Sequence, residues 1–472
     1  MKPIIFSIFF LLNAPILLGQ SNQKEMLPQS FSLGGTGLET YSKTLIDNDG
    51  NIVFSSVTYD KETRNEYMYL IKMDIKGKII WSKILGTGGL VKSMCLDQNS
   101  NIYCLLNTNY ATIDGINNCN DENGVICKFT KQGKLEKIYP LGSSLVPTKI
   151  IINSKNQLTL LGQSTYHLNY RDFSSNSKQG ELYIMNIDIS NGDFINYNKI
   201  LQTDSSSYFF YKPTLISTNE GYYLSFGFNK NVVDANSNKT NNDTGFGVCK
   251  IDENFKVKWM KKFRDEVFFS HTKSNKTIIC GNFKSQLLID TLSVNSSNLN
   301  GDIFITEIND NGKCIWIDKI ESNGAETNCI TSTKEDDIYI TGAFSKEIIF
   351  NNSKYQSNGG TDAFIVSFDK FKKKKYFGVF GSIESDWGQY ISPLKGNILT
   401  VISYYNEIKV GNIETVSNGE NDNIFITFGN SITKTKRISK SLNMYEYLEK
   451  KAPSAPPSEV KAEPAVQTES NH

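Results

Sequence analysis

The sequence predicts an all-β fold, a seven-bladed β-propeller of four-stranded antiparallel blades, because one pattern recurs seven times between Thr44 and Ser439. The period of the repeat is about sixty residues, which is long enough for four short strands and their turns. Two ladders of polar residues carry the repeat. An aromatic side chain at one fixed place in several of the repeats is the third observation.

The first ladder marks turns that follow a strand ending in a polar residue. Its members are separated by 56, 58, 64, 57, 60 and 61 residues, and they are Asp74, Thr130, Asp188, Asp252, Asn309, Asp369 and Asn430. The second ladder marks polar hairpin corners that lead into another strand. Its separations are 50, 56, 64, 55, 61 and 60 residues, and its members are Asn51, Asn101, Gln157, Gly221, Lys276, Asp337 and Asn397. Two ladders that run in step are hard to obtain by chance.

Local composition indicates strands at the expected places. Residues 337–344 (DIYITGAF) and 302–308 (DIFITEI) are rich in β-branched and aromatic residues and are bounded by Gly, Asn and Asp. Residues 309–312 and 75–77 then provide the Asx and Gly chemistry that reverses a backbone between antiparallel strands. We therefore expect hairpins after these strands.

Aromatic residues recur seven residues after the first ladder. Trp81, Trp259 and Trp316 occupy this place, and Tyr376 occupies it in the next repeat. A large flat side chain at one place per blade suits packing between sheets, where it buries roughly 150 to 250 Å². We interpret these residues as core and not as a ligand cage.

The repeats resemble those of a known family, the bacterial seven-bladed β-propeller repeat (SBBP-type) proteins. The resemblance is strongest at residues 337–344 and 359–369 (GGTDAFIVSFD), and next strongest at residues 301–304 with Trp316. The middle blades depart from the pattern: Thr130 replaces an acidic residue, Ile195 or Tyr197 stands near the Trp place, and residues 229–245 carry an insertion. The resemblance implies a fold and no particular activity.

Two segments compete to complete the ring. Residues 31–35 (FSLGG) resemble the end of a last strand, as in residues 83–89 (KILGTGG), whereas residues 432–438 offer an alternative. Either would pair sheet edges that are otherwise exposed to aggregation. We expect closure by the N-terminal segment.

The sequence divides into three parts. Residues 1–20 read as a secretory signal peptide, with Lys2, an apolar stretch over 4–18 and cleavage near Gly19 or Gln20. Residues 21–440 form the predicted propeller. Residues 441–472 are expected to hold a short helix over 442–451 and a disordered tail rich in Pro, Ala and Glu. No later stretch approaches the roughly 20 apolar residues of a transmembrane segment.

Charge and cysteine content narrow the classes of partner. The net charge of +1 argues against nucleic acid, and the basic run at 372–375 is expected to be a solvated turn. The sequence contains eight cysteines, and the expected location outside the cytoplasm permits disulfides. Cys119 with Cys127 and Cys95 with Cys104 are candidate pairs, although free buried thiols explain the residues equally well.

Signals for catalysis and for metal binding are weak. The only histidines are His167, His271 and His472, and no CxxC motif occurs. Residues 47–51 (DNDGN) resemble the start of a calcium loop, but Thr58 stands where such a loop requires Glu, so a hairpin is the better interpretation. We therefore predict no catalytic, cofactor-binding or metal-binding residues and no cofactor.

The expected function is a non-enzymatic, protein-binding scaffold of the bacterial cell envelope, associated with an outer-membrane secretion or assembly machinery. The alternative is a glycan-binding propeller, for which the aromatic run at 208–211 (YFFY) is a candidate, although a buried strand is the plainer interpretation of that run. A propeller hydrolase ranks below both. The expected location is the periplasm or the cell exterior, with the periplasm favoured because no sorting module is visible.

Overall fold

The computed structural model consists of β-strands connected by turns and loops. The residues that it describes are 29–34, 38–59, 66–108, 112–113, 116–117, 124–141, 145–164, 167–170, 173–176, 180–203, 208–229, 232–234, 244–410, 413–429 and 442–443. Within these ranges no helix occurs, and nearly all pairing is antiparallel. The all-β prediction is confirmed.

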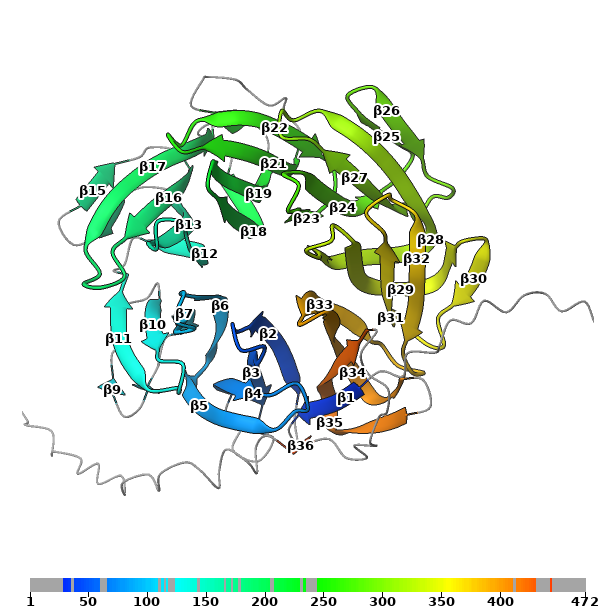
Figure 1. The fold of residues 1–472 in the computed structure, drawn as a ribbon, viewed down its shortest axis with the longest axis horizontal. Coiled ribbons are helices and arrows are strands. Elements are labelled where there is room, and N and C mark those ends of the chain that lie inside the picture. The colour runs from blue at the N-terminus through cyan, green and yellow to red at the C-terminus, as the bar shows by residue number, and fades with distance from the viewer. Residues whose placement is uncertain are drawn as a thin grey trace, which may run out of the picture.

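The sheets stand around a common centre, as in a β-propeller (Figure 1). The first sheet contains β2 (Glu39–Ile46), β3 (Ile52–Tyr59), β4 (Glu66–Met73) and β5 (Ile79–Thr87). The second contains β6 (Gly89–Leu96), β7 (Ile102–Thr108), β10 (Val125–Phe129) and β11 (Leu135–Pro140). The third contains β12 (Val146–Ile152), β13 (Leu158–Ser164), β16 (Glu181–Ile187), β17 (Phe194–Thr203) and β20 (Val232–Asp234).

Three more sheets complete the ring. The fourth contains β18 (Tyr208–Thr218), β19 (Gly221–Asn229), β21 (Gly245–Asp252) and β22 (Val257–Phe263). The fifth has eight strands: β23 (Val267–His271), β24 (Thr277–Phe283), β27 (Asp302–Ile308), β28 (Cys314–Ser332), β29 (Ile338–Phe350), β30 (Ser353–Gln356), β31 (Asp362–Phe368) and β32 (Lys374–Phe380). The sixth, here called the closing sheet, contains β33 (Trp387–Leu394), β34 (Asn397–Val410), β35 (Ile413–Phe428), β1 (Gln29–Gly34) and β36 (Leu442–Asn443).

Smaller ribbons decorate this ring. They are β8 (Thr112–Ile113) with β9 (Ile116–Asn117), β14 (His167–Tyr170) with β15 (Phe173–Asn176), and β25 (Gln286–Ile289) with β26 (Leu292–Asn295). Each ribbon lies within the connection between the second and third strands of a four-stranded unit. Insertions at this place leave the pairing of the unit intact.

The long strand β28 joins two four-stranded units into the eight-stranded sheet. Its residues up to Ile320 pair with β27, and its residues from Glu321 onward pair with β29. The outer strand of one unit therefore continues directly into the inner strand of the next. The two units keep the repeat of about sixty residues although no loop separates them, because both use β28.

The N-terminal strand closes the ring, as predicted. β1 pairs antiparallel with β35, with Phe31 opposite Phe425, and their rings stack. Phe31 also lies against Gly77 in the turn between β4 and β5, where an added Cβ would come within 2.6 Å of its ring. The competing segment, residues 432–438, lies outside the described residues.

Both polar ladders mark turns, as predicted. The Oδ1 atom of Asp74 accepts the backbone N–H groups of Lys76 and Lys78 at 2.8 and 2.9 Å. Asp252 and Asp369 make the same pair of bonds in their own turns. Members of the second ladder come directly before, or begin, the second strand of each unit. Asn430 lies outside the described residues.

The three tryptophans pack between neighbouring sheets, which confirms their core role. Trp81 donates from Nε1 to the Lys131 carbonyl at 3.1 Å and covers Gly133 of the next sheet. Trp259 and Trp316 are also half-buried in apolar clusters. Tyr376 is 41% exposed, and its ring stacks on Phe428 of the closing sheet.

Apolar clusters fill the spaces between successive sheets. One cluster joins Val53 and Leu70 of the first sheet to Leu106 and Val125 of the second. Cys104 belongs to this cluster, whereas Cys95 belongs to the cluster on the opposite face of its sheet. The two thiols are not bonded to each other, so this candidate disulfide is wrong.

Two edge strands come from segments that the sequence placed elsewhere. Strand β20 lies within the predicted insertion at 229–245, and it pairs with β17 of the preceding sheet. Strand β36 comprises the first residues of the predicted helix over 442–451 and pairs in parallel with β1. Both cover an edge that would otherwise expose unpaired backbone groups. The signal peptide, Cys119, the rest of the predicted helix and the tail lie outside the described residues.

Candidate functional site

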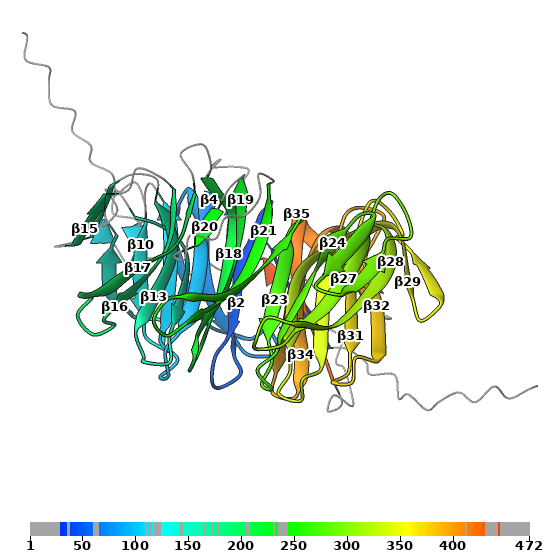
Figure 2. The same cartoon turned by 90° about the horizontal axis from the view of Figure 1, so that it is seen from above.

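Antiparallel pairing gives the ring two different faces. The tight turns after the first and third strands of each unit lie on one face, here called the turn face. The connections after the second and fourth strands lie on the opposite face, here called the loop face, and they include the inserted ribbons. The side view shows strands running between the two faces (Figure 2). Function on such a scaffold belongs to loops and to the ring centre.

A repeated clasp stiffens the turn face. Lys72 lies two residues before Asp74, a member of the first ladder. It forms an ion pair with Asp47 at 2.7 Å and donates to the Lys131 carbonyl of the next sheet. Lys250 occupies the same place and pairs with Glu220 and with Asp310. Each lysine thus ties two turns together across neighbouring units. The clasp is structural, because each lysine is held on a strand and its acidic partners lie in the turns.

The Lys250 clasp contains residue types that are also found in acid–base sites. The Tyr223 hydroxyl donates to Asp310 at 2.8 Å, and the Tyr223 ring stacks on His271 with centroids 4.4 Å apart. Burial lowers the pKa of His271, so the imidazole is neutral at pH 7. Since Lys250 repeats the geometry of Lys72, we assign this cluster to the clasp and not to catalysis.

The calcium-like segment is a hairpin, as predicted. The Asp47 carboxylate accepts the backbone N–H groups of Asp49 and Asn51 at 2.9 and 2.7 Å, and the Lys72 ammonium neutralises it. Although burial alone would raise it, these bonds hold the pKa of Asp47 below its usual value. In the described part of the chain, no group of three or more acidic, His or Cys side chains is placed to hold a metal ion.

The basic run at 372–375 is distributed among separate ion pairs. Lys372 pairs with the buried Glu307, Lys374 with Asp318 at 3.6 Å, and Lys375 with Asp337 at 3.2 Å. This turn was expected to be solvated, but Lys372 is largely buried between neighbouring units. The run therefore does not present converging ammonium groups to a phosphate.

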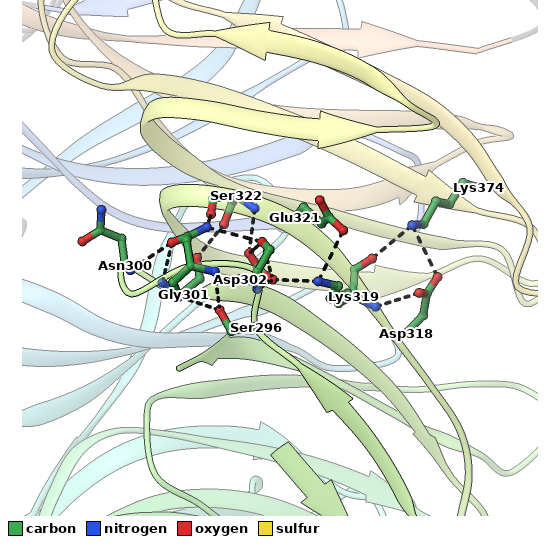
Figure 3. Close-up of polar contacts among 11 residues, drawn as sticks. Ser296, Asn300, Gly301, Asp302, Asp318, Lys319, Glu321, Ser322 and Lys374 are labelled. Atoms are coloured by element: carbon green, nitrogen blue, oxygen red, sulfur yellow. Dashed lines mark hydrogen bonds and ion pairs between the residues drawn. The ribbon is translucent and has the colours of Figure 1, made fainter. Parts of the chain in front are cut away.

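The loop face is held by buried aspartates at the start of third strands. Asp302 receives the backbone N–H of Ser297 at 2.7 Å and that of Ser322 at 2.9 Å, and it forms an ion pair with Lys319 at 3.2 Å (Figure 3). The carboxylate thereby joins the loop before β27 to the middle of β28. Lys319 also pairs with Glu321, which lies beside it in Figure 3.

The next unit lacks this lysine. Val379 pairs with Phe364 in the same register in which Lys319 pairs with Phe304, so Asp362 receives no ammonium partner there. Asp386 lies near Asp362, and both residues are completely buried, each with one carboxylate oxygen that has no hydrogen-bond partner. Burial and the charge of Asp362 raise the pKa of Asp386 to about 7. No substrate reaches these enclosed carboxyl groups, so we treat them as a stability element.

The innermost strands surround the ring centre and contact one another in turn around it (Figure 1). They are β2, β6, β12, β18, β23, the second half of β28, and β33. Several of them carry a β-bulge at a similar height. The pairing shifts between Tyr41 and Lys43 in β2, around Lys92 in β6, and before Lys149 in β12. A bulge redirects a side chain out of the regular alternation of the strand.

Lys43, Lys92 and Lys149 lie on the innermost strands of three successive sheets. The charges of both Lys43 and Lys149 act on the thiol of Cys329, which lies across the ring on β28. Lys149 also interacts electrostatically with Cys95 on β6.

Lys92 is the extra residue of the bulge in β6. Its neighbours Val91 and Ser93 are fully buried, whereas Lys92 is only half-buried. One edge of β6 pairs with β7, and β6 is the innermost strand of its sheet (Figure 1). Burial nevertheless lowers the pKa of both Lys92 and Lys149.

The sequence reasoning missed these lysines, although it contained a signal for them. Lys43 and Lys149 each precede their second-ladder residue by eight positions, and Lys92 precedes its own by nine. Once the second ladder is known, these places identify residues on the innermost strands. The aromatic run at 208–211 also lies on an innermost strand, β18, which confirms its assignment as a strand.

Comparisons with known proteins agree only with the general architecture. No protein-family model matches the sequence, and no curated protein matches it. Solved structures that resemble the chain include the WD40 domain of Neurospora crassa Pan2, with 9% identity and a TM-score of 0.42 over 84% of this chain and 91% of that one. A catalytically inactive virginiamycin B lyase from Staphylococcus aureus, with quinupristin, is 11% identical and has a TM-score of 0.42, over 85% of this chain and 99% of that one. YCF48 bound to D1 peptide is 8% identical and has a TM-score of 0.41, over 87% of this chain and 97% of that one.

These likenesses are too distant to support an argument about activity. The resemblance to bacterial seven-bladed repeat proteins remains an interpretation of the residues themselves. The described residues include no helix that is long and apolar enough to cross a membrane.

Proposed function

We propose that this chain is a non-enzymatic protein-binding scaffold of the bacterial cell envelope, built as a seven-bladed propeller. The blade number follows if the eight-stranded sheet counts as two blades and each other large sheet as one. The clasped turn face supplies a rigid base. The loop face supplies variable connections that a partner protein can recognise.

The observation that carries the proposal is a set of exposed apolar side chains at the loop-face end of the closing sheet. Ile383 and Val416 are 73% and 63% exposed, and Leu38 is also exposed. Leu38 bridges to Asn421 on β35, and Gly381, close to Ile383, bridges to Lys409 on β34. These bridges place Leu38 and Gly381 beside the closing sheet, to which Val416 belongs, and apolar exposure of this kind is typical of a protein-binding surface.

The proposed location follows from the apolar segment at 4–18, which we take as part of a signal peptide over residues 1–20. We propose a periplasmic or extracellular protein whose partner belongs to an outer-membrane secretion or assembly complex. N-terminal sequencing of the protein from cells tests the first part. A mature N-terminus near Ser21 is expected, and retention of Met1 would contradict the assignment.

Affinity purification tests the binding role. The chain is tagged after His472 and purified from gently solubilised envelope, and copurifying proteins are quantified by mass spectrometry. A stoichiometric outer-membrane partner is expected with the wild type and should be lost when Ile383→Lys and Val416→Lys are combined. Phe371→Lys is the matched control, because Phe371 is 78% exposed on the turn face.

Other results would replace the proposal. A protein recovered alone would rule out a stable complex, and retention on a polysaccharide column would then favour the glycan-binding alternative. Loss of the partner from the Phe371→Lys control as well would show that the loop face is not the specific surface.

A further inference from the structure

We propose that residues 444–451 of this chain dock on the exposed apolar side chains of the loop face, Leu38, Ile383 and Val416, and that a partner protein has to displace them. The inference rests on the proposed function, because it assigns a regulation to the surface that carries that function. Three features lead to it: the direction in which the chain leaves β36, the contacts around Val416, and the composition of residues 444–451.

The chain leaves the closing sheet at the loop face. β1 is the fourth strand of this sheet and runs antiparallel to β35, so Gly34 lies at the loop-face end of β1. β36 runs parallel to β1, with Asn443 opposite Gly34. Residues 444–451 therefore start at the loop face and not at the turn face.

The start of this segment lies close to Val416. Asn443 pairs with Gly34, and the Gly34 carbonyl accepts the Asn418 side-chain amide at 3.5 Å. Asn418 is only two residues from Val416 on β35. Leu38 bridges to the same stretch of β35. The end of β36 and two of the three apolar side chains are thus gathered around one short stretch of chain.

Ile383 lies close to the strand that pairs with Val416. Glu384 follows Ile383, and its Oε1 atom accepts the Asn406 side-chain amide at 3.4 Å. Asn406 in turn precedes Glu407, which is the cross-strand partner of Val416. The hairpin of β34 and β35 therefore lies next to Ile383 and carries Val416.

The segment is long enough to cover this surface. Only β1 separates β36 from β35 in the closing sheet, so the two strands are roughly 10 Å apart. The eight residues of the segment span roughly 12 Å as a helix and up to about 28 Å when extended. Either conformation reaches Val416.

The composition of the segment matches the apolar surface. Residues 444–448 (MYEYL) contain four apolar or aromatic side chains in five positions, whereas residues 452–472 contain no Phe, Trp or Tyr. Contact between this stretch and the loop face removes apolar groups on both sides from water, which is favourable. Residues 444–448 are therefore the part of the C-terminal region best suited to the surface.

Charges at the rim favour the same occupant. Glu384 and Glu414 are exposed beside the apolar side chains, and Lys409, opposite Glu414, offsets part of this negative charge. Lys450 and Lys451 follow the apolar stretch of the segment. Opposite charges around an apolar contact favour one orientation of the docked chain.

A tethered segment competes with a partner even when its own contacts are weak. A short tether gives an effective concentration in roughly the millimolar range, so an intrinsic dissociation constant of about 1 mM is enough to keep the surface covered much of the time. A partner then binds with an affinity reduced in proportion to the uncovered fraction. We expect the loop face to bind only partners that outcompete residues 444–451.

Photo-crosslinking of the purified full chain tests the docking in the absence of any partner. The photoreactive amino acid p-benzoylphenylalanine is placed at Tyr447, and crosslinked peptides are identified by mass spectrometry. Crosslinks to peptides that contain Ile383 or Val416 are expected, with a yield that does not change on dilution. The same photoreactive group at Val460 is the control and should give a yield several-fold lower.

Substitutions within the segment test which contacts hold it. With the photoreactive group at Tyr445, Leu448→Lys should lower the yield several-fold, whereas Val460→Lys should leave it unchanged. Lys450→Glu combined with Lys451→Glu should also lower the yield, and adding Glu384→Lys and Glu414→Lys should restore it. In the affinity purification, Tyr447→Lys with Leu448→Lys should raise the recovery of the partner about two- to fivefold, because the competitor is removed.

Several results would overturn the docking. They are the absence of crosslinks from position 447 to the loop face, equal yields from positions 447 and 460, and a yield that rises with protein concentration, which would make a second copy the occupant. Each of them leaves the scaffold proposal intact, since loss of the partner in the combined Ile383→Lys and Val416→Lys variant tests that proposal separately. Conversely, crosslinks to the loop face in a protein that recovers no partner would contradict the scaffold proposal alone.

Discussion

Replacing Asp386 by Asn should make the protein more stable, and the gain should be clearly larger at pH 8 than at pH 5. Asp386 is fully buried, and its Oδ2 accepts the Ser382 backbone N–H at 2.8 Å and the Ser382 hydroxyl at 3.1 Å. Its Oδ1 has no hydrogen-bond partner, and neither does one oxygen of the nearby Asp362. An Asn side chain keeps an acceptor for Ser382 and presents an amide donor in place of the second oxygen.

The pKa of Asp386 sets the size and direction of the effect. Burial, together with the charge of Asp362, raises it to about 7 from an ordinary value of 3.8. Because the pKa is higher in the folded protein, folding favours the protonated acid, and this stability is lost as the pH rises from about 4 through about 7. The difference corresponds to at most about 4 kcal/mol, at roughly 1.4 kcal/mol per pH unit.

Urea unfolding of wild type and Asp386→Asn at pH 5, 6, 7 and 8 measures this dependence. The advantage of the variant should grow with pH and reach roughly 2 to 4 kcal/mol at pH 8. Glu335→Gln, at an exposed turn position, serves as the control and should track the wild type. A difference between wild type and Asp386→Asn that does not change with pH would refute the reasoning, as would a variant that is less stable throughout.

Two further predictions concern the packing that holds the ring together. Gly312 and Gly396 have nearly the same positive φ, 80° and 79°, but only Gly312 faces a neighbour, since an added Cβ would lie 2.5 Å from Trp259. Gly312→Ala should therefore lower the free energy of unfolding by about 1 to 3 kcal/mol more than Gly396→Ala, and equal losses in denaturant unfolding would contradict the inter-sheet packing. Phe31→Ala should cost about 3 to 5 kcal/mol by the same measurement, because Phe31 is buried in the closing strand, whereas Phe371→Ala at an exposed turn should cost little. An unchanged Phe31→Ala protein would mean that β1 does not hold the ring closed.

The regular turns and the inter-sheet aromatics could be predicted because their physics is local. Asp74 accepts N–H groups from residues two and four positions further along, so the turn is encoded within five residues. The place of Trp81 is likewise set by its distance along one strand from that turn. A repeat multiplies such local signals, which is why the all-β architecture and the closing role of Phe31 could be inferred.

Edge pairing was harder to infer, because it depends on which unpaired backbone lies nearby. Strand β20 pairs with a sheet that precedes it in the chain, and β36 extends in parallel beside β1. Neither segment is distinctive in composition. Only the folded ring brings an open edge within reach of each.

By itself, the sequence determined the β-architecture, the period of its units and the turns that delimit them, because side chain–backbone hydrogen bonds and strand patterning act over a few residues. The tertiary structure decided which charged groups meet. Lys43 and Lys149 lie in different repeats, yet both act on Cys329 because ring closure brings β2, β12 and β28 around one centre. The pKa of Asp386 is raised to about 7 chiefly because packing of the sheets buries its carboxyl group, and the charge of Asp362 adds to the shift. Electrostatic energies depend on distance through space and on burial, and neither quantity is set until the sheets have packed.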